Sequence, residues 1–288
     1  MKHKILLVGS TGMVGSEVYN KFKDIFTLLP TACNNSNKNT LKLDLTNFNN
    51  VNDVINYFNP TIIINCAAYT DVNNAEKNKM LARNINVLGV ANLIKASKKG
   101  TKLIHISSDY VFDGKKGNYK EEDLTYPVNY YGKTKLESEN LIIGSNKPYV
   151  IFRPNVLYSS NFKYNNFLSW ILSSLSKNVH LSIVSDQKSN PTYIPELVKA
   201  IFNSILLDFR GILHIGSNDS LSRFEFAFKV CRIFKLNAEL ISKIESANLK
   251  QVASRPLNST LNTSKIKEVL DMKFANTDYY LNKIYKSL

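Results

Sequence analysis

Short apolar runs alternate along the chain with longer stretches in which apolar residues recur every three or four positions. The short runs are typical of buried strands, and the longer spacing is typical of helices that cover a sheet. Their alternation predicts an α/β fold, with a doubly wound and mainly parallel sheet between two layers of helices. The expected strands are Lys4–Val8, Phe26–Ala32, Thr61–Asn65, Lys102–Ser107 and Tyr149–Arg153, and the expected helices are Asn50–Phe58, Lys79–Lys98 and Tyr131–Ile143.

After Pro154 the pattern loosens into shorter elements. We expect a helix near Asn166–Ser176, a strand at Gly211–Ile215 and a helix near Arg223–Phe234. This change predicts a cofactor-binding domain over residues 1–154 and a smaller α/β lobe over residues 155–288. The division is soft, because no linker separates the two parts, and we expect them to interleave.

A glycine-rich turn follows the first expected strand. Gly9, Gly12 and Gly15 permit a tight turn, close approach of the backbone to a pyrophosphate and close packing of helix on strand. The phosphates would bind amide groups at the N-terminus of a helix beginning near Met13. The turn therefore predicts a dinucleotide site in a domain of the Rossmann type, although a chance glycine turn is the alternative.

Tyr131 and Lys135 are four residues apart in an expected helix and so share a face of it. A neighbouring ammonium favours the ionised form of a phenol, which otherwise has a pKa near 10. Such a pair can supply the proton that turns a carbonyl into an alcohol. Taken alone, the spacing is also compatible with a solvated helix face.

Ser107 ends an expected strand of the parallel sheet, and Ser108 and Asp109 follow it. Parallel sheets bind their ligands at the carboxyl ends of strands, so these hydroxyls would lie near the ligand. Ser108 could then bind a substrate carbonyl and share a proton network with Tyr131. A serine-rich turn that only caps the strand is the alternative.

These motifs together resemble the extended short-chain dehydrogenase/reductase family, and within it the dTDP-4-dehydrorhamnose reductase group. The resemblance runs over nearly the whole chain. The segments that carry it, besides the glycine turn and Ser108–Gly114, are Asn65–Val72, Asn86–Gly89, Asn129–Leu136, Asp186-Gln187, Pro191-Thr192, Ala253–Pro256 and Leu261-Asn262.

The resemblance implies catalytic roles for three residues. Ser108 would polarise the C4 carbonyl of a nucleotide-linked 4-keto-6-deoxy sugar, and Tyr131 would deliver the proton. Lys135 would lower the pKa of Tyr131 and bind the nicotinamide ribose. Tyr130 has no lysine four residues later, so it is interpreted as a packing or substrate-wall residue. Asn86 matches an asparagine near the family's active site, and a buried structural amide is the alternative.

The resemblance also implies NADPH as cofactor, with NADH usable. The segment Cys33–Lys38 lacks the carboxylate that usually binds the ribose of NAD, and Lys38 could pair with a 2′-phosphate. The residues expected to contact the cofactor are Gly9, Thr11, Gly12, Met13, Val14, Gly15, Asp44, Leu45, Ala67, Ala68, Tyr69, Tyr131 and Lys135. Those expected to contact the substrate are Ser108, Asp109, Tyr110, Asn166 and Arg255, and a structural ion pair is the alternative for Arg255.

One departure from the family pattern and one other relative bear on this resemblance. Arg153-Pro154-Asn155-Val156 lacks the tryptophan that the rhamnose-pathway reductases carry there, and Trp170 is expected to be a core residue. The β subunit of methionine adenosyltransferase also resembles these reductases. A non-catalytic, cofactor-binding regulatory subunit is therefore the alternative function, although intact Ser108, Tyr131 and Lys135 favour catalysis.

The composition excludes several other classes. The net charge of +14 comes from dispersed basic residues without an RNA-binding motif, which argues against nucleic acid as a partner. No apolar run is long enough to span a membrane and no signal-peptide pattern is present, so we expect a cytoplasmic protein. Cys33 and Cys66 are expected to be buried thiols. Glu17 fits a position at which some family members bind magnesium, but Glu196 matches only with a shift, so no metal is assigned. The resemblance implies a monomer or homodimer.

Overall fold

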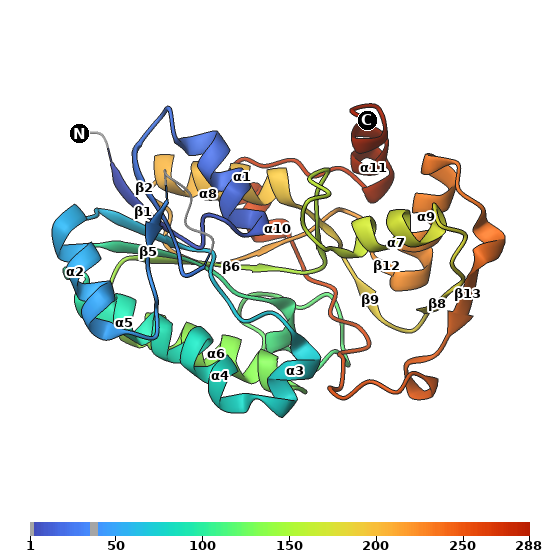
Figure 1. The fold of residues 1–288 in the computed structure, drawn as a ribbon, viewed down its shortest axis with the longest axis horizontal. Helices are drawn as coiled ribbons and strands as arrows, with labels where there is room; N and C mark the ends of the chain where they lie inside the picture. The colour runs from blue at the N-terminus through green and yellow to red at the C-terminus, as the bar shows by residue number, and fades with distance from the viewer. Residues whose placement is uncertain (1–2, 35–39) are drawn as a thin grey trace.

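The structure is a computed structural model that describes residues 3–34 and 40–288. Seven parallel strands form a central sheet in the order β11-β6-β5-β4-β1-β2-β3 (Figure 1). The predicted doubly wound α/β fold is thereby confirmed. The strands are β1 Lys4–Val8, β2 Thr27–Ala32, β3 Leu41–Lys42, β4 Ile62–Asn65, β5 Lys102–Ile106, β6 Tyr149–Pro154 and β11 Gly211–Ile215.

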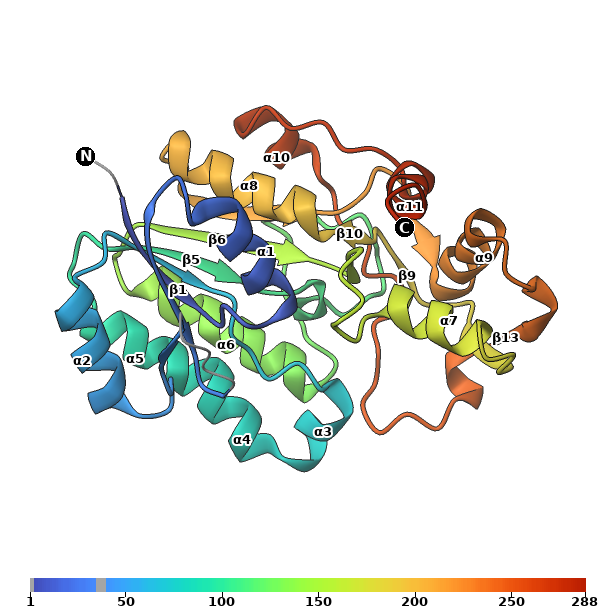
Figure 2. The same ribbon diagram turned by 45° about the horizontal axis from the view of Figure 1, so that its top comes forward.

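Each face of the sheet buries alternate residues of the same strands. In β1, Ile5 and Leu7 pack into one core, and Leu6 and Val8 pack into the other. Successive side chains of a strand point to opposite faces, so a strand covered on both sides must be apolar throughout. Figure 2 shows the two helical layers. One contains α1 Met13–Phe22, α8 Ile194–Leu206 and α10 Ser264–Val269; the other contains α2 Phe48–Phe58, α5 Gly89–Ala96 and α6 Tyr130–Gly144.

The predicted helix Lys79–Lys98 is interrupted. It consists of α4 Lys79–Arg83, a π-helical turn at Asn84–Leu88 and α5, and α3 Val72–Lys77 precedes it. A π-helical turn inside a helix is uncommon and often accompanies a functional site. Here it carries Asn86, which lies beside α6.

A smaller lobe follows the central sheet. Its core joins Tyr158 of β7 with Phe226 of α9 and Leu281 of α11. Its elements are β7 Leu157–Tyr158, α7 Phe167–Leu175, β8 Leu181–Val184, β9 Lys188–Ser189, β10 Thr192–Tyr193, β12 Leu221–Ser222, α9 Arg223–Phe234, β13 Ile241–Ile244, α11 Thr277–Tyr285, and short turns at Ala238–Leu240 and Ser246–Asn248.

The chain returns to the large sheet after residue 154. Helix α8 packs against α1, and β11 pairs with β6, so residues 194–215 complete the first half of the fold. The strand at Gly211–Ile215, which the sequence pattern assigns to the second part of the chain, therefore belongs to the central sheet.

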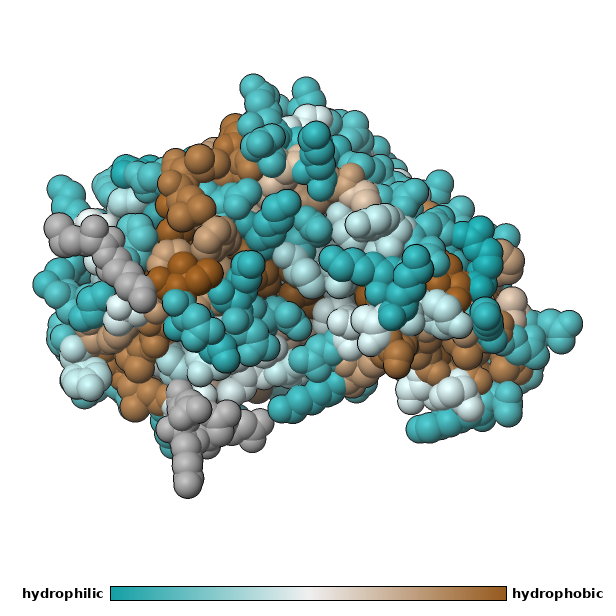
Figure 3. All heavy atoms as spheres, turned by 90° about the horizontal axis from the view of Figure 1, so that it is seen from above, coloured by the Kyte–Doolittle hydropathy of each residue, from teal (hydrophilic) through white to brown (hydrophobic). Residues whose placement is uncertain are grey.

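The surface, the cysteines and the helices can be compared with what the composition predicts. The face in Figure 3 is largely hydrophilic, and its apolar areas are separate patches. Cys33 is exposed and Cys66 is half-buried, so the expectation of two buried thiols is wrong for Cys33, which lies just past the end of β2. Within residues 3–34 and 40–288, no helix is both long and apolar enough to cross a membrane.

Candidate active site

The glycine turn lies between β1 and α1, and α1 begins at Met13 as predicted. Gly9 adopts φ +77°, and a Cβ there would lie 2.8 Å from the backbone nitrogen of Ala67. A Cβ on Gly15 would collide with the carbonyl oxygen of Gly9. Gly12 is the N-cap of α1 and offers no side chain to the first amides of the helix. These amides are left for an anionic ligand.

The loop after β3 is held against α5. The backbone carbonyl of Leu45 accepts a hydrogen bond from Asn92 at 2.8 Å, and Leu45 packs so closely on Gly89 that a Cβ there would approach its side chain to 2.9 Å. The Asp44 carboxylate accepts hydrogen bonds from the amide and hydroxyl of Thr46. Asp44 and Leu45, both predicted to contact the cofactor, therefore lie in a loop that these hydrogen bonds hold in place.

The loop after β4 is held by Asn86. Its side-chain oxygen accepts from the Tyr69 amide at 2.7 Å, and its nitrogen donates to the Tyr69 carbonyl and to Thr134 of α6. Asn86 thus positions the segment that contains the predicted cofactor contacts Ala67, Ala68 and Tyr69. Both polar atoms of this buried side chain hydrogen-bond to protein atoms. This agrees with the alternative interpretation of Asn86 as a buried structural amide.

Ser108 and Asp109 lie where β5 ends. The Ser108 hydroxyl donates to Asp109 Oδ1 at 3.0 Å and accepts from the Tyr110 amide at 3.1 Å. The other oxygen of Asp109 accepts from Ser259 at 2.6 Å. Burial raises the pKa of Asp109 to about 6, and the hydrogen bonds from Ser259 and Ser108 limit that rise. The carboxylate is therefore ionised at neutral pH.

Tyr131 lies in the first turn of α6, next to these groups. Asn129 caps the helix by accepting from the amide of Gly132 at 2.8 Å. The ring of Tyr131 meets that of Tyr110 edge to face, with centroids 6.0 Å apart. Ser108 lies close enough to the Tyr131 phenol to lower its pKa, against the larger rise caused by burial. The structure thus brings together the predicted hydroxyl and the predicted phenol.

The expected effect of Lys135 on Tyr131 is not found. Burial raises the pKa of Tyr131, and the charge of Asp109 raises it further. The Lys135 amino group instead donates to the carbonyl oxygen of Ile106 at 2.7 Å. Burial lowers the pKa of Lys135 to about 8, although the carboxylate of Glu139 opposes this shift. The two residues share a helix face, but the lysine side chain extends toward the end of β5.

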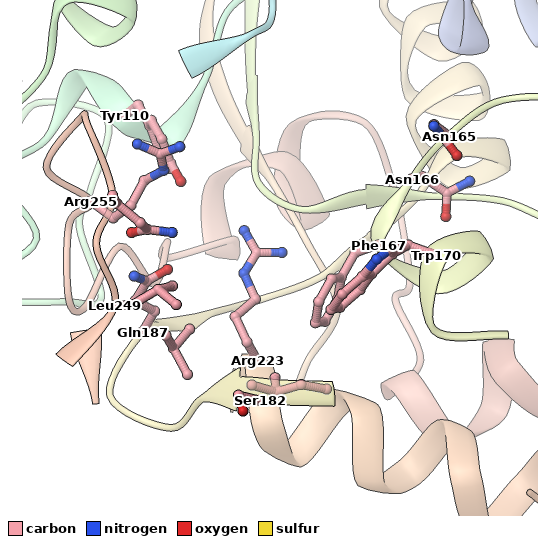
Figure 4. A pocket seen from close by; sticks show the side chains of 13 residues that line it. Tyr110, Asn165, Asn166, Phe167, Trp170, Ser182, Gln187, Arg223, Leu249 and Arg255 are labelled. Carbon is pink, nitrogen blue, oxygen red and sulfur yellow. The ribbon is translucent and has the colours of Figure 1, made fainter. Parts of the chain in front are cut away.

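A cavity of about 500 Å³ lies beside Tyr110, and Figure 4 shows the side chains that line it. Asn166 and Arg255, both predicted to contact substrate, lie at different parts of its wall. The Asn166 side chain also caps α7 by accepting from the Ser169 amide at 3.1 Å. Arg255 donates to the carbonyl of Ala253 and to the side chain of Asn73, and no ion pair of Arg255 is found among the described residues.

Trp170 and Arg223 are among the lining residues that the sequence did not predict as substrate contacts. Trp170 is not a core residue, since 42% of it is exposed, and it stacks on Phe167. The guanidinium of Arg223 lies 5.0 Å from the centre of the Phe167 ring, and its charge lowers the pKa of Tyr110 against the rise caused by burial. Ser222 and Glu225 form a capping box, a sequence signal that places Arg223 at the start of a helix.

The position that lacks the family tryptophan has an unusual backbone. Val156 adopts φ +40°, which is rare for a β-branched residue. The amide of Thr192 donates to the carbonyls of Asn155 and Val156 and so holds this turn. The segment is therefore ordered by contacts from β10.

The remaining expectations concern metal and phosphate. Glu17 and Glu196 line a separate cavity together with Lys21, Lys199 and Lys283. Over residues 3–34 and 40–288, no group of three or more histidine, cysteine or acidic side chains could hold a metal ion. The suggested role of Lys38 lies outside the described residues. Tyr130 receives the ammonium of Lys79 over its ring.

Solved structures match the fold over its full length. A dTDP-4-dehydrorhamnose reductase from Bacillus anthracis, in complex with NADP, has a TM-score of 0.90 and 29% identity, and the match covers 100% of both chains. A dTDP-4-dehydrorhamnose reductase from Clostridium acetobutylicum has a TM-score of 0.90 and 30% identity, covering 98% of each chain.

Curated sequences give the same family and also the alternative. The dTDP-4-dehydrorhamnose reductase of Aggregatibacter actinomycetemcomitans is 31% identical over 94% of each chain. The methionine adenosyltransferase 2 subunit beta of Danio rerio is 30% identical over 96% of this chain and 87% of its own. Residues 2–288 match the family described as RmlD substrate binding domain. The chain therefore belongs to this family, and the resemblance to dTDP-4-dehydrorhamnose reductases is confirmed.

Proposed function

We propose that the protein is an NADPH-dependent reductase, able also to use NADH, that reduces the C4 keto group of a nucleotide-linked 4-keto-6-deoxy sugar. The favoured substrate is dTDP-4-dehydrorhamnose, and the product would feed surface-polysaccharide synthesis. The observation that carries this proposal is the placement of Ser108 and Tyr131 together around Tyr110, beside a cavity lined by two arginines and an aromatic pair.

The glycine turn suits a dinucleotide. Gly9 and Gly15 leave no room for a Cβ, so the backbone is packed in the manner that a close phosphate approach requires. Lys163 lines the same small cavity as Ser10 and Thr11 and would add a positive charge near the phosphates. When bound, the reduced nicotinamide would supply a hydride to the substrate carbon.

The contacts predicted for the cofactor follow the edge of the sheet. They begin at the glycine turn, continue through the loops after β3 and β4, and end at α6. The residues proposed to hold it are Gly9, Thr11, Gly12, Met13, Val14, Gly15, Asp44, Leu45, Ala67, Ala68, Tyr69, Tyr131 and Lys135.

The protein groups divide the proton chemistry between them. Ser108 would redirect its hydrogen from Asp109 to the carbonyl oxygen and so stabilise the negative charge that develops there. Tyr131 keeps its proton at neutral pH, because burial and Asp109 raise its pKa. It would transfer this proton to the new alkoxide and recover one from solvent. A charged Lys135 would stabilise the transient phenolate.

The cavity offers groups for the nucleotide end of the substrate. Guanidinium groups bind diphosphates through paired hydrogen bonds, a role suited to Arg223 and Arg255. The stacked rings of Phe167 and Trp170 would bind a nucleobase face. Tyr110 and Asn166 would complete the wall, and Asp109 would act through Ser108.

The test is a direct assay. Purified protein is mixed with NADPH and dTDP-4-keto-6-deoxy-L-mannose, and the loss of NADPH absorbance is followed. We expect turnover that Tyr131→Phe reduces at least about a hundredfold. Turnover only with a GDP- or UDP-linked keto sugar would overturn the dTDP assignment and retain the reductase class.

The second candidate is a cofactor-binding regulatory subunit, which the similarity to methionine adenosyltransferase 2 subunit beta favours. Such a protein would bind NADPH without consuming it and change the activity of a methionine adenosyltransferase. In that case Tyr131→Phe would leave the measurable activity unchanged, whereas it must impair a reductase.

A further inference from the structure

His105 is a buried histidine that the proposed proton transfer does not use. It lies in β5, paired with Asn65 of β4, and only 2% of it is exposed. One ring nitrogen faces Asn65, and the other faces Ser138 and Lys135 of α6. The imidazole thus connects the end of β4 with the predicted catalytic lysine.

The contacts of Asn65 determine which nitrogen of His105 carries the hydrogen. The Ala67 amide donates to Asn65 Oδ1 at 3.1 Å, so the side-chain nitrogen of Asn65 must face the ring. That nitrogen lies 3.2 Å from His105 Nδ1 and can only donate. Nδ1 is therefore the acceptor, and in the neutral ring the hydrogen is on Nε2. Burial and the charge of Lys135 hold the pKa of His105 well below its usual range, so the ring is neutral.

The Nε2 hydrogen points toward two groups. Ser138 Oγ lies 3.3 Å away and donates its own hydrogen to the Lys135 carbonyl, so its oxygen can accept. The Lys135 nitrogen lies 3.2 Å away. An uncharged amine can accept a hydrogen bond from Nε2, whereas an ammonium group has no lone pair. The ring therefore disfavours the charged form of Lys135 in this position.

Two further titratable groups face Lys135. The carboxylate of Glu139 favours its charge, but Arg153 already pairs with that carboxylate, with the closest atoms 2.6 Å apart. Burial raises the pKa of the Cys66 thiol to about 12, so it is uncharged at neutral pH. Of these groups, the imidazole of His105 is therefore the one whose direct contact with Lys135 depends on whether Lys135 is charged.

We propose that His105 is a positioning residue that presents a hydrogen to the Lys135 amino group. This contact lowers the upper end of the pH range over which Lys135 is charged, and so sets the alkaline limit of reduction. The second part rests on the proposed reductase function. The first part is a property of the ligand-free chain and can be tested without substrate.

The first experiment is a long-range ¹H–¹⁵N spectrum of the full-length protein with labelled histidine, recorded between pH 6 and 9. His105→Gln identifies the signal by its loss. We expect His105 as the neutral Nε2–H tautomer throughout this range. Observation of the Nδ1–H tautomer, or of a charged ring at neutral pH, overturns the proposal whatever the enzyme's activity.

The second experiment compares pH profiles of kcat/KM for the wild type, His105→Gln and His214→Gln. In His105→Gln the amide oxygen of the new side chain can accept from an ammonium, so the alkaline limb should move upward by about one pH unit. His214 is the matched control, since it is buried and contacts Arg153 and the Tyr119 carbonyl. Its substitution should leave the limb in place.

An unmoved limb in His105→Gln, or an equal shift in His214→Gln, would contradict control of Lys135 by His105. Absence of turnover in all three proteins, wild type included, would instead reject the proposed function. The tautomer measurement would then still decide the part of the proposal that concerns Lys135.

Discussion

The indole of Trp170 stacks on the ring of Phe167, with the centroids 5.7 Å apart and the planes inclined by 24°. Both rings line the cavity beside Tyr110 (Figure 4). Stacked, partly exposed aromatic rings form a platform that favours flat ligands. This pair therefore gives α7 of the smaller lobe an aromatic surface in the cavity, and we propose that it binds the nucleobase.

Trp170→Ala should raise KM for the nucleotide sugar. Stacking of a base on an aromatic ring contributes on the order of 1–3 kcal/mol, so a roughly five- to hundredfold rise is expected. Affinity for NADPH should not change. Steady-state kinetics and fluorescence titration with NADPH separate the two effects, and an unchanged KM would remove Trp170 from the substrate site.

Arg223→Met should weaken substrate binding without unfolding the protein. The side chain of Arg223 is partly exposed, and it is only one of several groups that lower the pKa of the buried Asp109. Removing a guanidinium from a diphosphate should raise KM at least about tenfold. Arg210, which is exposed and paired with Asp208 away from the cavity, is the matched control. Equal effects of Arg223→Met and Arg210→Met would argue against a diphosphate contact.

Lys135→Met should stabilise the ligand-free protein at neutral pH. The folded-state pKa of about 8 lies below the usual 10.5, so between these values the unfolded chain binds more protons than the folded one. Wild-type stability therefore rises with pH over this range. The gain in the variant should be at most about 3 kcal/mol near pH 7 and should shrink toward pH 10.

Thermal unfolding at several pH values tests this expectation, with Lys133→Met as the control. Lys133 lies on the exposed face of the same helix, so its substitution should give no pH-dependent difference. A stability gain of Lys135→Met that grows as the pH rises would contradict the lowered pKa.

The ion pair between Arg153 and Glu139 should behave as a buried pair. The two side chains are 3% and 0% exposed, and Ser107 also donates to the Glu139 carboxylate. Arg153→Met leaves that carboxylate without its cation and should cost about 3–5 kcal/mol of unfolding free energy. The double variant with Glu139→Met should recover much of this loss. Denaturant unfolding measures both, and additive losses would mean that the pair does not act as a unit.

Local sequence patterns determined most of the sheet and part of the site. Strands such as β1 and β4 are recognisable because a strand covered on both faces must be apolar at every position. The helix start at Met13 follows from the glycine turn, since the steric needs of Gly9 and Gly15 are local. Ser108 and Tyr131 were found as candidates because strand ends and helix faces limit where a side chain can lie.

Only the tertiary structure decided what these side chains contact. Spacing puts Lys135 on the face of Tyr131, but the carbonyl of Ile106 and the ring of His105 determine where its amino group lies. Trp170 looked like a core residue because its helix is apolar, and its exposure depends on which elements of the small lobe pack against α7. Contacts between residues distant in sequence depend on the packing of the whole chain, so a local sequence pattern does not predict them.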